Sequence, residues 1–215
     1  MPPIISTFNT GSFHKICRKL ARRDADLANI IAEYGYPPMW TRPATFQTLV
    51  LTILEQQVSL ASAYAAFKKL KEKIGFVTPK KILALSDAEL RACYFSRQKI
   101  VYARELASTI LRRELILKKL FFSSDDDIRA EMIRIKGIGH WTVDVYLMHA
   151  LQRTDLFPLG DIALVNSLRE TKRLPKDVSK EEMLAIAEAW RPYRTVAAMI
   201  LWHAYIKKRN IKLQG

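Results

Sequence analysis

The amino-acid sequence predicts an all-α fold. Glycine is scarce, at 7 of 215 residues, and no Asn-Gly, Asp-Gly or Gly-Gly pair marks a tight β-hairpin. Apolar residues recur instead at the i, i+3, i+4, i+7, i+8 spacing that gives a helix one buried face. The clearest example is formed by Phe46, Leu49, Val50, Ile53 and Leu54. No segment has a convincing strand pattern.

Several helix starts can be read directly from the sequence. Ser96 precedes an apolar segment, where its hydroxyl can cap the helix N-terminus. Thr78 before Pro79 is a typical helix start, and Ser86 with Glu89 has the spacing of a capping box. About ten helices are expected, covering residues 12–34, 43–55, 59–73, 79–85, 87–93, 97–113, 125–134, 140–151, 162–170 and 180–207, the last broken near Pro192.

Proline-containing breaks divide these helices into a middle block and two flanks. The breaks lie at residues 37–38 and 157–158. Because each flank is too short to be stable alone, the flanks are expected to pack together. The sequence therefore predicts a central helical lobe of residues 41–154 and a second lobe of residues 1–40 plus 155–215. A cleft is expected between the two lobes.

The charge of the chain indicates a polyanionic partner. Lys and Arg total 35 against 21 Asp and Glu, a formal net charge of +14, while 49% hydrophobic residues are enough for a folded core. Residues 68–119 alone carry a net charge of +9, counting 14 basic and 5 acidic residues. A solvated basic face is the alternative for any single lysine there.

The composition argues against a secreted or membrane protein. The longest run without a charged residue, residues 1–14, is too short and too polar for a spanning helix. The N-terminus also lacks the basic start of a signal peptide, because no Lys or Arg precedes Lys15. Two cysteines cannot form a disulfide framework. We expect an intracellular protein, in the cytoplasm or nucleoid of a bacterium or the nucleus of a eukaryote, that is monomeric and binds no membrane.

The segment around two closely spaced glycines predicts a phosphate-binding hairpin. Gly137 and Gly139 lie between two apolar helical segments, and without side chains they let backbone N–H groups approach a phosphate oxygen. The next helix would direct the positive end of its dipole at the anion, with Lys136 and His140 as flanking donors. An ordinary helix–helix turn with a glycine C-cap is the alternative.

Four ordered segments resemble one protein family. Residues 135–142 (IKGIGHWT) are similar to the helix-hairpin-helix of the HhH-GPD DNA glycosylase superfamily, and residues 155–164 (DLFPLGDIAL) are similar to its aspartate-containing segment. Residues 53–59 (ILEQQVS) and 190–194 (WRPYR) match two further segments. The closest resemblance is to the 3-methyladenine DNA glycosylase II (AlkA-type) branch. This implies two helical lobes with the active site in their cleft, without the N-terminal β-rich domain of longer members.

Asp161 is the expected catalytic residue. When an N-glycosidic bond breaks, the sugar comes to resemble an oxocarbenium ion in the transition state. A fixed carboxylate can stabilise that positive charge or orient the attacking water. Local sequence alone favours Asp161 as a helix N-cap, and the resemblance favours catalysis; the two roles are compatible. Asp155 and Asp144 are rivals by proximity.

Aromatic residues are expected to form the base pocket. The resemblance places Trp141 and Trp202 there, with Tyr146 nearby in sequence, and core packing is the alternative for each. An electron-rich indole face would attract an alkylated, positively charged purine. Trp141 also stands where strand-cutting relatives have a lysine nucleophile, so the resemblance implies no lyase activity.

The remaining expected contacts are to DNA. Gln56, Gln57 and Ser59 match the segment that enters the double helix, with Gln57 at the inserting position, and a polar helix terminus is the alternative. Lys136, Gly137, Gly139 and His140 are expected to bind phosphate. No cofactor or catalytic metal is expected.

The resemblance also implies a possible alkali ion, Na⁺ or K⁺, on the hairpin. Its ligands would be the backbone carbonyls of Ile133, Ile135 and Ile138.

The leading interpretation is a monofunctional glycosylase that excises alkylated purines such as 3-methyladenine from double-stranded DNA. A non-catalytic helix-hairpin-helix DNA-binding protein is one alternative, but it would need neither Asp161 nor the two tryptophans. A glycosylase for a mispaired or deaminated base is the other.

Overall fold

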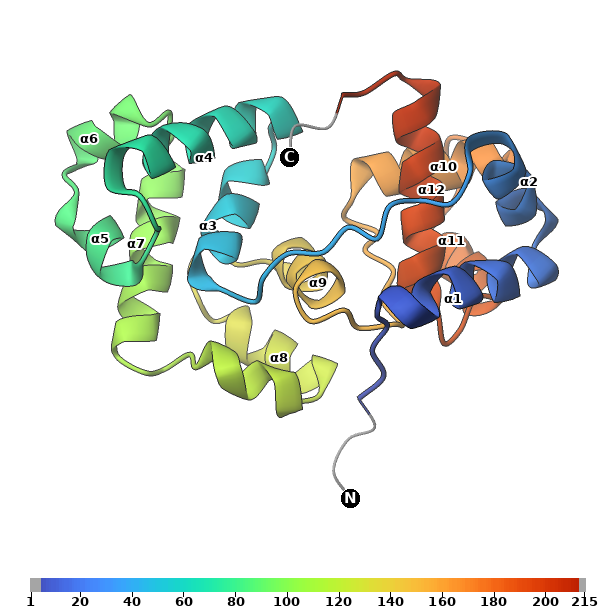
Figure 1. Cartoon of the computed structure of the whole chain (residues 1–215), viewed down its shortest axis with the longest axis horizontal. Helices are drawn as coiled ribbons and strands as arrows, with labels where there is room; N and C mark the ends of the chain where they lie inside the picture. The colour runs from blue at the N-terminus through green and yellow to red at the C-terminus, as the bar shows by residue number, and fades with distance from the viewer. Residues whose placement is uncertain (1–4, 213–215) are drawn as a thin grey trace. The chain divides into compact units, whose positions relative to one another are not determined.

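The protein is helical, as its computed structural model shows for residues 5–212 (Figure 1). Twelve α-helices and one 3-10 helix cover this part of the chain. The only β-structure within it is an isolated bridge between Thr7 and Arg153. The all-α prediction is confirmed. None of these helices is both long and apolar enough to cross a membrane.

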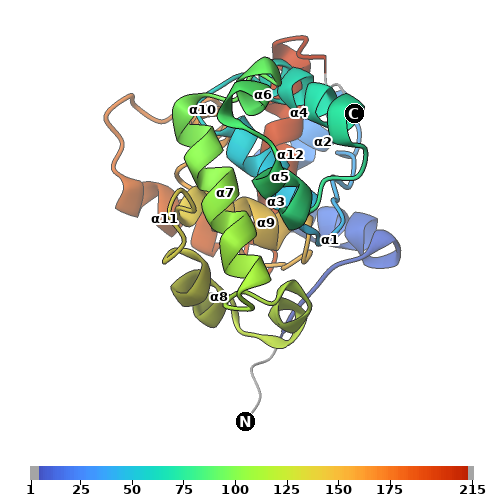
Figure 2. The same cartoon turned by 90° about the vertical axis from the view of Figure 1, so that its left-hand side faces the viewer.

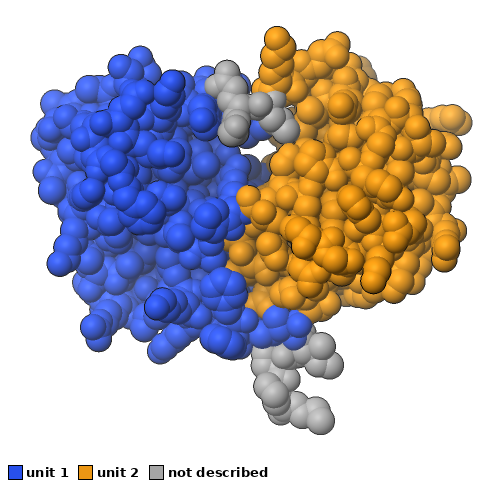
Figure 3. All heavy atoms as spheres, in the orientation of Figure 1, with its two compact units in different colours: residues 1–5, 42–146, 213–215 blue, residues 6–41, 147–212 orange. Residues whose placement is uncertain are grey.

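The helices form two compact units (Figure 3). Unit 1 consists mainly of Arg42–Tyr146, and unit 2 combines Ser6–Thr41 with Leu147–Lys212. From Ser6 the chain therefore runs first through unit 2, then builds the main part of unit 1 and returns to unit 2. The return lies inside one continuous helix, between Tyr146 and Leu147, earlier than the sequence-based boundary at residue 154.

Unit 1 is organised around one central helix, α7. It packs on α5, α3 and α6, while α3 packs on α4, and Figure 2 shows α7 in the foreground of this group. Serine or threonine caps begin α4, α5, α6, α7 and α8, as the sequence indicated for several of them. The helices are α3 (Phe46–Glu55), α4 (Leu60–Ile74), α5 (Pro79–Ala84), α6 (Asp87–Ala92), α7 (Arg97–Leu111), the 3-10 helix η1 (Leu117–Phe122), α8 (Asp125–Met132) and the first part of α9 (His140–His149).

Unit 2 is built around α12. Ten consecutive residues of this helix, Thr195 to Ala204, are buried, because α12 packs against α10, α2 and α1 (Figure 1). A helix that is buried on all sides has no polar face, which explains its apolar sequence. The helices of this unit are α1 (Thr10–Arg23), α2 (Ala25–Tyr34), α10 (Ile162–Lys172), α11 (Lys180–Glu188) and α12 (Arg194–Lys208).

One predicted helix, residues 12–34, is wrong. Asp24 divides it into α1 and α2, because its carboxylate accepts hydrogen bonds from the N–H groups of Asp26 (3.0 Å) and Leu27 (3.3 Å) and so caps α2. Lys172 and the Trp190 indole N–H also bind this carboxylate, each at 2.8 Å. Burial acts to raise the pKa of Asp24, but these hydrogen bonds outweigh it and lower that pKa.

The expected break near Pro192 is present, and the 3-10 helix is the element that was missed. Residues 189–192 form turns that separate α11 from α12. The 3-10 helix η1 was not predicted at all. Its six residues are too few to show a helical period.

Candidate functional site

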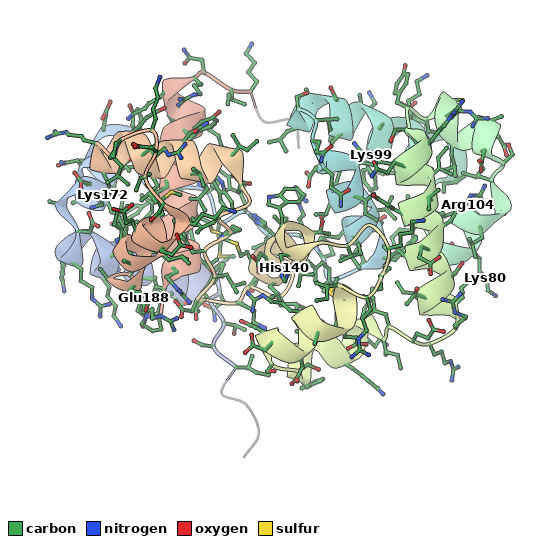
Figure 4. All side chains as sticks on the ribbon, turned by 180° about the vertical axis from the view of Figure 1, so that it is seen from behind. Lys80, Lys99, Arg104, His140, Lys172 and Glu188 are labelled. Atoms are coloured by element: carbon green, nitrogen blue, oxygen red, sulfur yellow. The ribbon has the colours of Figure 1, made fainter. Side chains whose placement is uncertain are left out.

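The segment between α8 and α9 is a tight hairpin with an exposed tip. Ile135 and Ile138 are buried and anchor it, and the Ile138 N–H donates to the Ile135 carbonyl at 3.0 Å. Lys136, Gly139 and His140 are exposed. Helix α9 begins here, since the Val143 N–H donates to the Gly139 carbonyl (3.1 Å), and Figure 4 labels His140 in its first turn. An exposed helix N-terminus flanked by basic side chains suits an anion.

The two glycines of the hairpin are required for different reasons. Gly137 has a φ of +91°, and a Cβ atom there would lie 2.0 Å from Cγ of Tyr102 on α7. It is therefore required by backbone conformation and by packing. A Cβ atom on Gly139 would have no neighbour within 4 Å. Gly139 thus leaves its surface open, as close approach of a phosphate requires.

The predicted insertion segment lies between α3 and α4. Gln57 is exposed and has a φ of +57°, a conformation that is uncommon for a residue with a side chain. Ser59 is the N-cap of α4, because its hydroxyl accepts from the Ser62 N–H at 3.2 Å. The side chain of Ser59 thus has a capping role that the base-contact prediction did not include.

Gln56 has an internal role that sequence reasoning did not identify. Its Nε2 donates to the Gly137 carbonyl (2.8 Å) and to the Thr142 hydroxyl (3.0 Å). Both of its amide N–H bonds are thereby used within unit 1. Gln56 can still accept a hydrogen bond from a base, but it cannot donate one without losing a protein contact.

The Asp161 carboxylate accepts hydrogen bonds from two different helices. It is the N-cap of α10, and its Oδ1 accepts from the Leu164 N–H at 2.8 Å. The same oxygen accepts from Nε1 of Trp202 on α12 at 3.0 Å. The capping role is therefore present, and the Trp202 indole of a second helix donates to the same oxygen.

The Trp202 ring stacks on the ring of His149. Only 9% of the Trp202 surface is exposed, and the two ring centroids lie 5.5 Å apart, with planes 25° from parallel. Nδ1 of His149 donates to the Trp40 carbonyl at 3.0 Å, because a carbonyl can only accept. Sequence reasoning could not identify this role of His149, because its stacking partner is 53 residues away.

The rival carboxylates are engaged elsewhere. The Arg194 guanidinium donates to Oδ1 of Asp155 at 2.8 Å and to its backbone carbonyl at 3.1 Å. Asp144 accepts from Arg129 at 2.8 Å. The Asp155 and Asp144 carboxylates are thus both bound by arginine side chains.

The two remaining base-pocket candidates differ in exposure. Trp141 lies in the first turn of α9 and is partly exposed. Tyr146 is 1% exposed, and its hydroxyl has no hydrogen-bond partner within the described part of the chain. Burial raises the pKa of this hydroxyl above its usual range. Such burial fits the core-packing alternative for Tyr146, and its pocket role stays a prediction.

Metal-binding groups are sparse. Over residues 5–212, no group of three or more His, Cys, Asp and Glu side chains is arranged to hold a metal ion. An alkali ion on the hairpin carbonyls stays a prediction. The Ile135 carbonyl already accepts the turn hydrogen bond from Ile138, so it could bind an ion only through its second lone pair.

The chain is similar to known DNA repair proteins. The YfjP protein of Bacillus subtilis is 31% identical over 186 residues, which cover 83% of this chain but only 65% of YfjP. DNA-3-methyladenine glycosylase 1 of Schizosaccharomyces pombe is 29% identical over 180 residues, 82% of this chain and 79% of that protein. The solved structure of an S. pombe 3-methyladenine DNA glycosylase in complex with abasic DNA superposes with a TM-score of 0.83, at 27% identity, over 94% of this chain and 99% of that one.

The family assignment rests on the segments that also carry the hairpin and Asp161. The model of the HhH-GPD family, described as a superfamily of base excision DNA repair proteins, matches residues 50–192. This match covers more than half of the chain and includes the insertion segment, the hairpin, Asp161 and its loop. The chain belongs to the HhH-GPD superfamily of base excision DNA repair proteins.

Proposed function

We propose that this protein is a DNA glycosylase that hydrolyses the N-glycosidic bond of alkylated purines, such as 3-methyladenine, in double-stranded DNA. The observation that carries the proposal is the Asp161 carboxylate, fixed by the α10 N-terminus and by the Trp202 indole. A protein that only binds DNA has no need of such a group. The curated relatives named for this activity support the same substrate class.

The carboxylate would act on the sugar of an extruded nucleotide. As the bond between C1′ and the base breaks, the electron pair leaves with the base and positive charge develops on the sugar. Asp161 stabilises that charge and orients the water that attacks C1′. Its two hydrogen bonds to Oδ1 hold it in place before the reaction, so little reorganisation is needed as charge develops.

Alkylated purines suit the aromatic residues of the site. An N-alkylated purine carries positive charge, and the face of an indole attracts a cation. His149 stacks on Trp202 and keeps its ring in one orientation, so Trp202 can offer a fixed aromatic surface. Trp141 is proposed as a second aromatic contact and Tyr146 as a third.

The proposed reaction stops at the abasic site. Lyase chemistry needs an amine that attacks C1′ and forms an iminium, and an indole nitrogen has no available lone pair for this. Trp141 stands at the position where the resemblance places that lysine. Lys136 is nearby in sequence, but it lies on the exposed hairpin before α9, where phosphate is the expected partner.

The proposal is tested by incubating the protein with DNA treated with a methylating agent and identifying the released bases by mass spectrometry. The expected products are methylated purines, released roughly a thousandfold more slowly by Asp161→Asn. Release of uracil or hypoxanthine from a parallel duplex that contains these bases, with no release from the methylated DNA, would assign the protein to deaminated bases. DNA binding without release of any base would show a non-catalytic DNA-binding protein.

The absence of lyase activity is tested separately by adding borohydride during turnover. A Schiff base would be reduced to a covalent protein–DNA adduct. We expect no adduct, and strand breaks only after alkali treatment. An adduct that maps to Lys136 would overturn the monofunctional proposal.

A further inference from the structure

The turn between α3 and α4 is held on both sides of its most exposed residue. On one side, the Lys99 ammonium donates to the Leu54 carbonyl at 2.7 Å in the last turn of α3. Lys99 lies in the first turn of α7 and is labelled in Figure 4. On the other side, Ser59 caps α4. Gln57 between them is exposed and in the left-handed conformation. That conformation persists only where surrounding contacts fix it.

Gln56 supplies the contact that ties this turn to another motif. The orientation of its amide follows from chemistry, because the Gly137 carbonyl can only accept, so it must face Nε2 and not Oε1. The second N–H then reaches the Thr142 hydroxyl. One side chain thereby joins the insertion segment to the hairpin and to the first turn of α9.

We propose that Gln56 is a positioning residue that fixes the insertion segment to the phosphate-binding hairpin, so that Gln57 is held ready to enter the base stack. This inference rests on the proposed function, because it assigns the turn a part in extruding the damaged nucleotide. It replaces the sequence-based expectation that Gln56 reads a base with a role inside the protein.

The contact has a mechanical consequence. A hairpin that holds a phosphate fixes the position of the DNA backbone relative to Gly137. Because Gln56 is bonded to the carbonyl of that same residue, the hairpin also fixes the distance from the backbone to Gln57. Gln57 would then enter the base stack at a fixed distance from the phosphate that the hairpin binds. Without the contact, the hairpin would still bind DNA, but the turn would lose its alignment.

Thr142 allows this role to be separated from direct contact with DNA. Its side chain is 1% exposed, so it cannot reach a base or a phosphate, yet it accepts one of the two Gln56 hydrogen bonds. Thr142→Val keeps the shape of the side chain and removes the acceptor. Thr109→Val is the matched control, because Thr109 is also buried in unit 1 but bonds only to the carbonyl of Glu105 in its own helix.

The experiment measures three quantities for the parent, Gln56→Ala, Thr142→Val and Thr109→Val. They are single-turnover release of methylated bases, affinity for an undamaged duplex, and amide hydrogen exchange of residues 57–59 without DNA. We expect Thr142→Val to lower base release about fivefold, the loss of one hydrogen bond, and Gln56→Ala to lower it further. Exchange at residues 57–59 should accelerate in both, while duplex affinity stays within twofold of the parent. Thr109→Val should match the parent in all three.

A double substitution distinguishes positioning from general destabilisation. If Thr142 acts through Gln57, then Thr142→Val in a Gln57→Ala background should cause no further loss of base release. An additive loss, or unchanged release and exchange in Thr142→Val alone, would overturn the proposal. If the parent releases no base at all, the proposed function fails, and accelerated exchange in Thr142→Val would still support the Gln56 contact as the link that orders the turn.

Discussion

The hairpin tip and the Asp161 cluster, defined as Asp161, Trp202 and His149, differ in which part of the chain faces the ligand. The tip offers exposed backbone at a helix N-terminus, and Gly139 contributes by having no side chain. The cluster offers side chains that are fixed by hydrogen bonding and stacking, with Trp202 almost fully buried. The tip suits binding of a repeating backbone charge, and the cluster suits chemistry on one nucleotide.

This difference predicts how each region fails. A site made of exposed backbone is damaged by added atoms, which keep the ligand at a distance. A site made of ordered side chains is damaged by removed atoms, which leave a charge or a ring without support. Substitutions at the tip should therefore weaken DNA binding and leave the chemical step intact, and substitutions in the cluster should do the reverse.

The largest effect is expected for Asp161→Asn. The amide keeps an oxygen that can accept from Leu164 and Trp202, so α10 remains capped, but the negative charge is lost. Single-turnover base release should fall roughly a thousandfold. Binding to lesion DNA should persist or tighten, because less negative charge faces the phosphates. Comparable release by parent and variant would assign the chemistry to another residue, with Asp155 next.

Gly139→Asp should give the next largest effect, this time on binding. The structure leaves open space at the Cβ position, so the fold should tolerate the side chain, while its charge would oppose a phosphate. Duplex affinity should fall between about tenfold and a hundredfold, with base release at saturating protein little changed.

Gly139→Ala and Gly137→Ala serve as controls for this prediction. The first should bind DNA with an intermediate affinity. The second should lower the melting temperature, because a Cβ atom there would collide with the Tyr102 ring. Parental DNA affinity in a folded Gly139→Asp protein would remove the hairpin from the binding site.

Trp202→Phe should have a smaller effect and should act on the chemical step. Phenylalanine keeps an aromatic ring on His149 but removes the N–H that donates to Asp161. Base release should fall about tenfold, in line with the loss of one charge-assisted hydrogen bond, and duplex affinity should be unchanged. A loss confined to affinity would contradict the division between the two regions. In an Asp161→Asn background the same substitution should cost less than in the parent.

The features that sequence could predict are those with a local cause. The glycine spacing, the Asp161 cap position and most helix starts follow from residues within one or two turns of each other. The motif resemblance extended this to Trp202, whose indole binds Asp161. Even the compatibility of capping and catalysis at Asp161 could be expected, because both depend on its place before α10.

The features that sequence could not predict depend on distant partners. Gln56 bonds to Gly137 across 81 residues, and Asp24 breaks a long helix partly because Lys172 binds it across 148 residues. The different demands on Gly137 and Gly139 come from Tyr102, which lies on another helix. No local spacing encodes such contacts, so they become visible only when the helices are packed.

The smallest effect is expected for Lys136→Met, which removes a charge from the hairpin but keeps its backbone. Lys136 is exposed, so the fold should be unaffected. If the backbone at Gly139 does most of the binding, duplex affinity at moderate salt should fall only about threefold. The plot of log affinity against log salt should become shallower by about 0.9, the contribution of one neutralised phosphate. Both are measured by fluorescence anisotropy with a labelled undamaged duplex at several salt concentrations. A loss as large as that of Gly139→Asp would mean that the side chain and not the backbone dominates the tip, and the contrast with the Asp161 cluster would no longer hold.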